Sequence, residues 1–435
     1  MFSSIHCLLK KVRSGLLKKM FIYILADGLS KALSFLILPL VSVYLVPEQL
    51  GIDMNFNVLQ GVLMLLAGQA LIGALPYFYY ERTREQVGIL IFNLLVIIVV
   101  SLFLFSIVIV LFTSLIEEYF YIGIWLQLLT IISAFSQFIS TINTQLYRLE
   151  EKPKIFGFLQ ILQCVVYLVL LITLVVVFKL EAVGKIMSLV VSFSLMMLVH
   201  FVLLKKRRYI VFRMDFHLIK DLLKYGLPLL PHALSFWVKG GMDKILITTY
   251  CGLSANGLYS MALSFGGVYS IFSSSFSNAF VPYLQQRIRQ ITPENALSEK
   301  RSIVRLSYRI CMVFMLLCIV LVCVCWVAIH YLLSSQYEGS FQFIPSLMIS
   351  LTIYSFYSLV IQYPYTMKKT KWLGIITFCG SIVQLLITYV LVSTIGIDGV
   401  KYSLVFGAVV IVAGVWWYSN RVYPMPWFSS KINNK

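Results

Sequence analysis

Charged side chains interrupt an apolar stretch near the middle of the chain. The sequence HALSFWVKGGMDKILIT, residues 232–248, is long and apolar enough for a membrane-spanning helix, yet it carries His232, Lys239, Asp243 and Lys244. A charge at the centre of a bilayer costs roughly 2.5–3.5 kcal/mol on insertion scales. Such residues face a bundle interior or an aqueous cavity by default, so they could bind an anionic group or a coupling ion.

A second group of charges lies in the first apolar stretch, where Asp27 and Lys31 are four residues apart on one helix face. On the later stretch, His232, Lys239 and Asp243 lie near one line at about 100° per residue. We predict a cationic substrate-binding wall of Lys31, His232 and Lys239, because lysine holds phosphate as a compact charge. Asp27 and Asp243 are the candidates for coupling to H⁺ or Na⁺.

A structural explanation of these charges stays open beside the functional one. Asp27 with Lys31, and Lys239 with Asp243, are pairs of opposite sign at helical spacing and could neutralise each other without a ligand. His232 could be a packing residue that bonds the backbone carbonyl freed by Pro231. The spacing alone does not decide between these explanations.

Other helices carry polar and aromatic side chains that could meet a substrate. Gln137 and Asn143 are too large for close helix packing, so we expect them to line the substrate path, although polar stripes also serve packing. Tyr354 and Tyr357 could stack on sugar rings or belong to an aromatic belt at the membrane surface. Both explanations remain open for the tyrosines.

The composition indicates a polytopic integral membrane protein. Hydrophobic residues make up 60% and charged residues 12% of the 435 positions, and the mean hydropathy is +0.91. No soluble domain of this length has such values. The chain lacks GxxxxGK[ST], HExxH and GxSxG motifs, and its cysteines follow no ligand spacing. We therefore predict no catalytic residues, no metal and no cofactor, and a protein that is not an enzyme.

Apolar runs of about 20 residues predict twelve spans. These are 20–46, 54–80, 88–114, 121–146, 155–178, 185–204, 222–250, 257–284, 306–333, 344–366, 372–394 and 400–418. Nearly all lysines and arginines fall in alternate connections, which predicts that both termini are cytoplasmic. The net charge of +18 then reflects topology and attraction to anionic membrane lipid, not binding to nucleic acid.

The two halves of the chain repeat one plan. KALSF (31–35) matches HALSF (232–236), ALPYFYYER (74–82) matches AFVPYLQQR (279–287), and GKIMSLV (184–190) matches GVKYSLV (399–405). We predict two parallel six-helix repeats with a substrate site at their interface. The predicted domains are a basic amphipathic cytoplasmic segment 1–19, an N-terminal lobe 20–204, a cytoplasmic linker 205–221, a C-terminal lobe 222–420 and a cytoplasmic tail 421–435.

The segment YGLPLLPHALSFWVKGGMDKILITTYCGLSANGLYSMALSF (225–265), with EEKPKIFG (150–157) and ALPYFYYE (74–81), resembles bacterial polysaccharide biosynthesis transporters. These are the O-antigen and capsule repeat-unit flippases of the multidrug/oligosaccharidyl-lipid/polysaccharide exporter superfamily. The resemblance implies an all-α membrane fold of about twelve helices in two six-helix lobes, V-shaped with a central cavity. It also implies alternating-access flipping of an undecaprenyl-pyrophosphate-linked oligosaccharide, for O-antigen, lipopolysaccharide or capsule, across the bacterial inner membrane.

Three other functions are weighed against this one. A cation-coupled multidrug antiporter shares the fold but should have an acidic or neutral cavity, whereas the residues here are mainly basic. A peptidoglycan precursor flippase should have two further helices. A membrane-embedded polysaccharide polymerase should have a long basic outward loop, and the segment near 334–343 is short and has no basic residue. A polymerase is instead a candidate partner.

Overall fold

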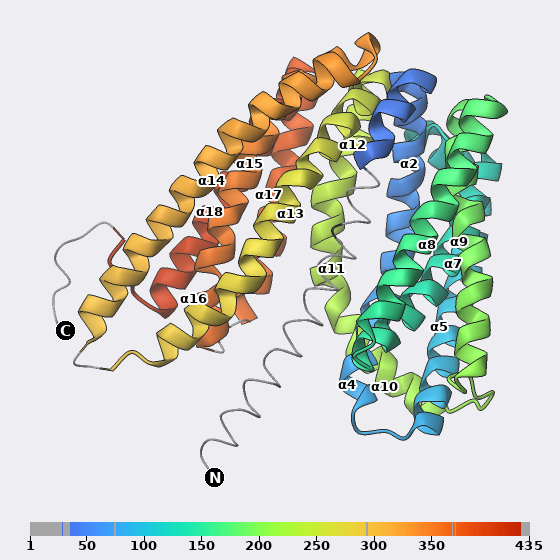
Figure 1. Ribbon diagram of the computed structural model, residues 1–435, viewed down its shortest axis with the longest axis horizontal. Coiled ribbons are helices and arrows are strands. Elements are labelled where there is room, and N and C mark those ends of the chain that lie inside the picture. The colour runs from blue at the N-terminus through green and yellow to red at the C-terminus, as the bar shows by residue number, and fades with distance from the viewer. Residues whose placement is uncertain are drawn as a thin grey trace. The chain divides into compact units, whose positions relative to one another are not determined.

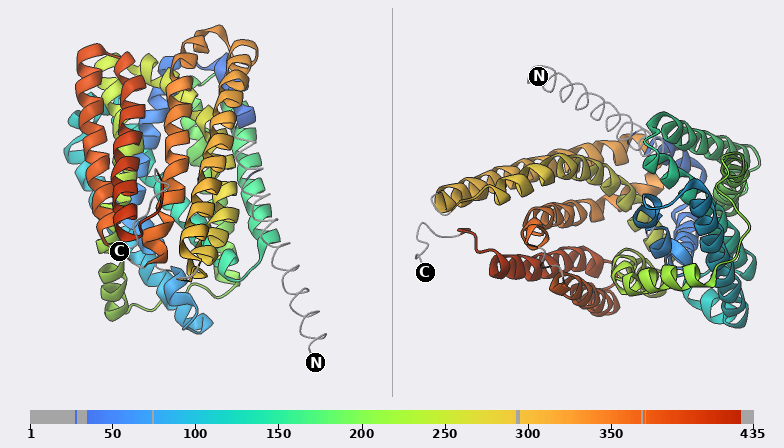
Figure 2. Two further views of the ribbon diagram at one scale, coloured as in Figure 1. Left: turned by 90° about the vertical axis from the view of Figure 1, so that its left-hand side faces the viewer. Right: turned by 90° about the horizontal axis from the view of Figure 1, so that it is seen from below.

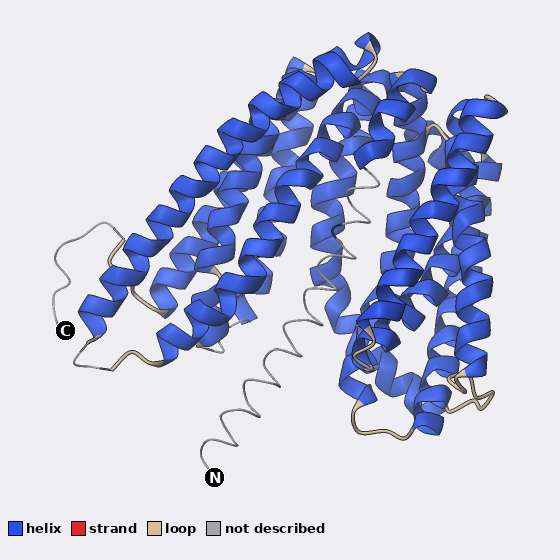
Figure 3. Ribbon diagram, viewed as in Figure 1, coloured by secondary structure: helices blue, strands red, loops and turns tan. Residues whose placement is uncertain are grey.

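Helices form every regular element in the part of the chain that the structure describes (Figure 1). The structure is a computed structural model, and it describes residues 28, 35–73, 75–292, 295–367, 369 and 371–427. Only the backbone is described at positions 232, 235, 236, 239, 278, 279, 282 and 371. No strand occurs among these residues (Figure 3). The predicted all-helical class is confirmed.

Nine helical segments of the described chain are long and apolar enough to cross a membrane. They are Pro47–Tyr79, Arg84–Leu111, Ile124–Leu149, Pro153–Val177, Glu181–Lys206, Ala296–Leu332, Ser335–Thr366, Trp372–Ile395 and Asp398–Val422. Of the remaining predicted spans, 20–46 lies largely outside the described residues and contains the short apolar helix Phe35–Tyr44. The span 222–250 is broken, and 257–284 lies within a serine-rich helix. The count of twelve stays a prediction.

The chain divides into two compact units, Met1–Leu234 and Ser235–Lys435. The first unit holds α2 (Pro47–Met64), η1 (Leu65–Gln69), α3 (Ala70–Ile72), α4 (Leu75–Tyr79), α5 (Arg84–Leu111), α6 (Thr113–Phe120), α7 (Ile124–Leu149), α8 (Pro153–Leu171), η2 (Ile172–Val177), α9 (Glu181–Lys206), α10 (Phe216–Gly226) and η3 (Leu227–Leu229). Helix α11 (Leu230–Trp237) contains the boundary. The second unit holds η4 (Val238–Met242), α12 (Asp243–Cys251), α13 (Leu253–Arg289), α14 (Ala296–Leu332), η5 (Ser335–Phe343), α15 (Ile344–Val360), α16 (Gln362–Thr366), α17 (Lys371–Ile395) and α18 (Asp398–Val422).

The helices of the two units pack in the same pattern, as the repeat predicts. In the first unit α7 packs against α2, α5 and α9, and α8 packs against α9 (Figures 1 and 2). In the second unit α15 packs against α13, α14 and α18, and α17 packs against α18. The buried core of the first unit includes Leu90, Phe138 and Leu204, one from each of α5, α7 and α9. Helix α7 of the first unit and helix α15 of the second therefore hold equivalent places in the packing of their units.

The matched glycines of the repeat have equivalent environments. A Cβ on Gly184 would lie 3.0 Å from the carbonyl oxygen of Leu174, and a Cβ on Gly399 would lie 2.4 Å from that of Leu391. Gly184 thus lets α9 begin against the backbone of η2, and Gly399 lets α18 begin against the backbone of α17. The two sequence repeats therefore also pack their helices in equivalent ways.

Replacing Gly399 with alanine is expected to destabilise the second unit by about 1–3 kcal/mol, because a backbone carbonyl cannot move aside as a flexible side chain can. Thermal unfolding of the detergent-solubilised protein measures the loss. Gly374→Ala is the control, since a Cβ there meets no atom within 4 Å. Equal unfolding temperatures for the two variants would contradict this account of the close contact.

The seventh predicted span is interrupted where its prolines and glycines lie. A 3₁₀ turn, η3, contains Pro228, and a π-helical turn, η4, contains Gly240 and Gly241. Proline and glycine pairs are recognised causes of such irregularities. The span therefore consists of short helices.

Helix α10 precedes these breaks and begins within the segment predicted as a linker. Asp215 caps it: its Oδ1 accepts hydrogen bonds from the backbone N–H groups of His217 (3.0 Å) and Leu218 (3.1 Å). The helix is amphipathic, buries Leu218 and Leu222, and packs against α3 and α5 of the first unit. The charged connection thus leads into a helix docked on the first unit.

Candidate functional site

The predicted cationic wall falls mostly where side chains are not described. Asp27 and Lys31 lie outside the described residues. His232 lies in α11 and Lys239 in η4, and only their backbones are described. The substrate-binding role of these residues stays a prediction.

Asp243 is the predicted coupling residue that the structure describes. It begins α12, is 9% exposed, and accepts hydrogen bonds from the Tyr259 hydroxyl (2.7 Å) and the Lys244 backbone N–H (2.9 Å). Tyr259 comes from α13 and is 1% exposed. The Tyr259 hydroxyl and the Lys244 backbone N–H thus fix this buried carboxylate where α12 and α13 pack together. Its role in coupling stays a prediction.

The two predicted substrate residues of α7 contact neighbouring helices of the first unit. Gln137 is half-buried, and its Oε1 accepts a hydrogen bond from Gln60 Nε2 of α2 at 3.2 Å. Asn143 is fully buried: its Nδ2 lies 2.8 Å from His200 Nδ1, and its Oδ1 accepts from Arg207 Nη1 at 3.0 Å. Asn143 therefore connects α7 to α9 and to the residue that follows α9. Substrate contact by either residue remains a prediction.

Tyr354 and Tyr357 lie three residues apart on α15 and are both partly buried. The Tyr354 hydroxyl donates to Gln384 Oε1 of α17 at 3.3 Å. These rings belong to the second unit, whereas Gln137 and Asn143 belong to the first. Stacking of the tyrosines on sugar rings remains a prediction.

A charge cluster that the sequence did not predict is centred on Glu150, just after α7. Glu150 Oε2 lies 2.8 Å from Lys152 Nζ, and Oε1 pairs with Arg207 Nη2 and accepts from the Tyr209 hydroxyl at 2.5 Å. The Arg207 guanidinium lies 4.0 Å from the centre of the Tyr147 ring. Since Glu150 is only 9% exposed, this cluster ties the end of α7 to the end of α9.

Burial alone would raise the pKa of Glu150, but Lys152, Tyr209 and Arg207 stabilise the anion and lower that pKa from 4.5 to about 2. Because the folded pKa lies below the unfolded one, the stabilisation is complete above pH 4.5 and is lost as the pH falls toward 2. We expect Glu150→Gln to lower the unfolding temperature at pH 7 and to differ less from the parent at pH 3. Thermal unfolding at both pH values checks this.

Glu118→Gln is the matched control, because Glu118 is exposed on α6 and its carboxylate has no ion pair among the described residues. It should unfold like the parent at both pH values. A Glu150→Gln difference that stays constant between pH 7 and pH 3 would contradict the low pKa.

A buried ion pair in the first unit was also missed. Lys185 Nζ of α9 lies 2.8 Å from Asp53 Oδ2 of α2, and the two side chains are 10% and 4% exposed. Both residues lie within two turns of a helix start, so in the sequence they look like ordinary interfacial charges. The repeat replaces Lys185 with buried Val400, so the second unit has no equivalent pair at this matched position.

Metal ligands do not gather in the described part of the chain. Among those residues no group of three or more His, Cys, Asp or Glu side chains could hold a metal ion, and the seven described cysteines are free.

Comparison with known proteins places the chain in a family. The sequence profile described as polysaccharide biosynthesis protein matches residues 16–287, which is more than half of the chain. The chain belongs to the polysaccharide biosynthesis protein family. The match includes Lys31, Asp53, Glu150 and Asp243.

A relative of this family member is protein 1 of the Lsg locus of Haemophilus influenzae (strain ATCC 51907 / DSM 11121 / KW20 / Rd). It is 23% identical over 416 residues, which cover 92% of this chain and 97% of the relative. The similarity therefore extends over both units.

Solved structures show the fold of this polysaccharide biosynthesis protein. The lipid II flippase MurJ in an inward closed conformation matches with a TM-score of 0.70 at 14% identity, over 92% of this chain and 87% of MurJ. An inward-facing multidrug resistance MATE family transporter of the MOP superfamily matches with a TM-score of 0.64 at 17% identity, over 92% and 94%. The chain is a multi-pass membrane protein with the fold of these transporters.

Proposed function

We propose that the protein is a flippase that moves an undecaprenyl-pyrophosphate-linked oligosaccharide repeat unit, for O-antigen or capsule, across the bacterial inner membrane. One observation carries the proposal: a chain of the polysaccharide biosynthesis family has the fold of a lipid II flippase. A lipid-linked sugar is a cargo consistent with both the polysaccharide biosynthesis family and the flippase fold. Alternating access would expose the headgroup to each side in turn.

The charges of the membrane-spanning segments supply the chemistry that this cargo needs. A pyrophosphate cannot cross hydrocarbon alone, because the desolvation of its charges costs many kcal/mol. In the proposal, Lys31, Lys239 and His232 line a water-accessible path and replace part of the hydration of the phosphates. The prenyl tail stays in the lipid throughout. Buried acids such as Asp243 would couple the cycle to H⁺ or Na⁺.

Deletion of the gene in its own host tests the proposal. Cells fed radiolabelled sugar should lose surface polymer and retain the lipid-linked repeat unit in the inner leaflet, and the wild-type gene should restore export. Normal polymer with altered dye export would instead support a cation-coupled multidrug antiporter, the alternative that the fold of the MATE transporter allows. Accumulation of the unlinked sugar precursor would point to a step before flipping.

A further inference from the structure

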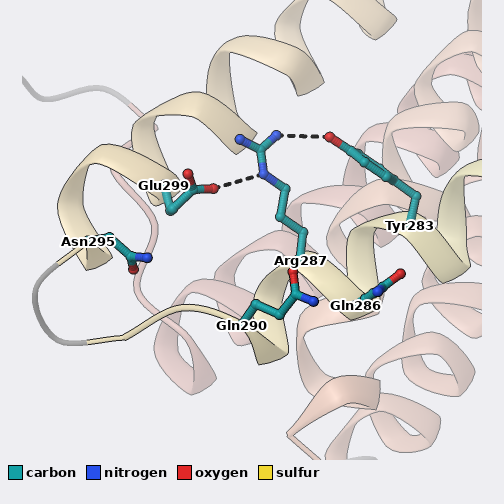
Figure 4. A pocket seen from close by; sticks show the side chains of 6 residues that line it. All are labelled: Tyr283, Gln286, Arg287, Gln290, Asn295 and Glu299. Carbon is teal, nitrogen blue, oxygen red and sulfur yellow. Dashed lines mark hydrogen bonds and ion pairs between the residues drawn. The ribbon is translucent and has the colours of Figure 1, made fainter. Parts of the chain in front are cut away.

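A polar cavity lies within the second unit, where α13 ends and α14 begins (Figure 4). Its volume is about 530 Å³, within the ~300–1,000 Å³ typical of small-molecule sites. It is lined by Tyr283, Gln286, Arg287, Gln290, Asn295 and Glu299. The helix ends beside it carry Arg289, Lys300 and Arg301, so the positive-inside rule assigns this cavity to the cytoplasmic side.

The described lining residues of the cavity are polar but carry little net charge. Arg287 donates from Nε to Glu299 Oε2 (2.8 Å), from Nη1 to the Tyr283 hydroxyl (3.1 Å) and from Nη2 to Ser302 Oγ (2.9 Å). Figure 4 shows this guanidinium between Glu299 and Tyr283. Among the described lining residues, Arg287 and Glu299 are the charged ones and they pair with each other, so these residues offer an anion no spare countercharge.

The remaining lining groups suit an uncharged polyhydroxyl ligand. Each carboxamide offers two N–H donors and one carbonyl acceptor, which matches a row of sugar hydroxyls. Gln286 and Gln290 are exposed, and neither side-chain amide bonds to another described residue. Asn295 Oδ1 accepts from the Thr292 backbone N–H at 2.9 Å, which leaves its NH₂ group for a ligand. Tyr283 is 48% exposed and adds an aromatic ring.

The matched position of the first unit lacks these properties. The repeat aligns Arg82 with Arg287 and Phe78 with Tyr283, and Arg82 lies over the Phe78 ring at 4.8 Å, where no hydroxyl is present. The cavity beside Arg82 has a volume of about 190 Å³. Its Asp215 caps α10, and its Asp221 lies 3.3 Å from His217 Nδ1. Those acceptors serve folding, whereas the side-chain amides of Gln286 and Gln290 make no such bond with a described residue.

We infer that the α13–α14 cavity binds an uncharged sugar residue of the lipid-linked oligosaccharide before the headgroup crosses the membrane. This inference rests on the proposed function and adds to it a recognition site for sugar that is separate from the cationic wall for phosphate. A site of this kind would let the protein select its repeat unit by the sugar and not by the pyrophosphate that all such lipids share.

Binding of soluble glycosides tests the inference. The purified protein in lipid nanodiscs is titrated with the methyl glycosides of glucose, galactose and N-acetylglucosamine, followed by saturation-transfer NMR, and with inorganic pyrophosphate. We expect saturable binding of at least one glycoside, weakened about tenfold in Gln286→Ala/Gln290→Ala because two sets of hydrogen bonds are removed. Both side chains are exposed, so the variant should unfold at the parent temperature.

Gln342→Ala is the control, since Gln342 is an amide of the same unit in η5, at the other end of α14. It should bind glycoside like the parent. Absence of glycoside binding, equal binding by the double variant, or displacement of the glycoside by pyrophosphate would overturn the inference. If glycosides do not bind while the deletion strain still traps its lipid-linked repeat unit, the sugar site is wrong and the flippase stands. If glycosides bind while that strain exports normal polymer, the flippase is wrong.

Discussion

Replacing Lys185 with methionine is expected to destabilise the first unit by about 3–5 kcal/mol, because it leaves the Asp53 carboxylate buried without its countercharge. The two groups lie 2.8 Å apart, and the Asp53 side chain is 4% exposed, so water cannot take the place of the lysine. Methionine keeps the length of the lysine stem, so the change removes charge more than volume. Thermal unfolding in detergent and the yield of folded protein in membranes measure the effect.

The double variant Asp53→Asn/Lys185→Met should recover much of this loss, because it removes both buried charges together. Lys401→Met is the matched control. It breaks the pair of Lys401 with Asp398, whose side chains are 28% and 60% exposed, and should cost less than about 1 kcal/mol. If Lys185→Met and Lys401→Met unfold alike, the Asp53–Lys185 pair does not hold α2 to α9.

Replacing Lys31 and Lys239 together with glutamine is expected to reduce surface polymer by about tenfold or more. Each lysine in the proposal makes a charge-assisted hydrogen bond to the pyrophosphate, and such bonds contribute about 1.5–3 kcal/mol each. The single variants should show smaller losses in the same direction. Incorporation of labelled sugar into surface polymer, normalised to the amount of the protein in the membrane, measures the effect.

Lys31→Arg/Lys239→Arg separates charge from packing, because it keeps both charges and should retain more export than the glutamine variant. Lys401→Gln serves as the control for a lysine outside the proposed path. Normal polymer from the double glutamine variant, at a normal protein level, would show that the two charges do not carry the cargo. They would then be explained by pairing with Asp27 and Asp243.

Much of the fold could be predicted from the sequence, because hydropathy and repeated motifs are recognised in short stretches of residues. The match of Gly184 with Gly399 predicted equivalent helix starts, and the structure shows both glycines against a carbonyl of the preceding helix. The breaks of the seventh span lie at Pro228 and Gly240, and each of these residues acts on its own backbone. The number of spans was less certain, because a broken helix and a serine-rich one lack a continuous apolar run.

The side-chain partners could not be predicted, because they come from distant positions in the chain. Asn143 was expected to line a path on grounds of size, yet its amide bonds to His200 and Arg207, about sixty residues later. In the sequence Lys185 resembles an interfacial lysine, whereas in the structure it pairs with Asp53 of another helix. A single sequence holds no signal for such pairs, since opposite charges at helix starts are common.

Flipping by the purified protein in vesicles is the decisive measurement for the proposed function. The protein is reconstituted in vesicles that carry its host's lipid-linked oligosaccharide in both leaflets, and a membrane-impermeant reagent that destroys exposed sugar is added outside. We expect the protein to make the inner-leaflet lipid accessible within the time of the assay, whereas protein-free vesicles keep it protected. Protection that is unchanged by correctly folded protein would show that the protein is not a flippase for this lipid.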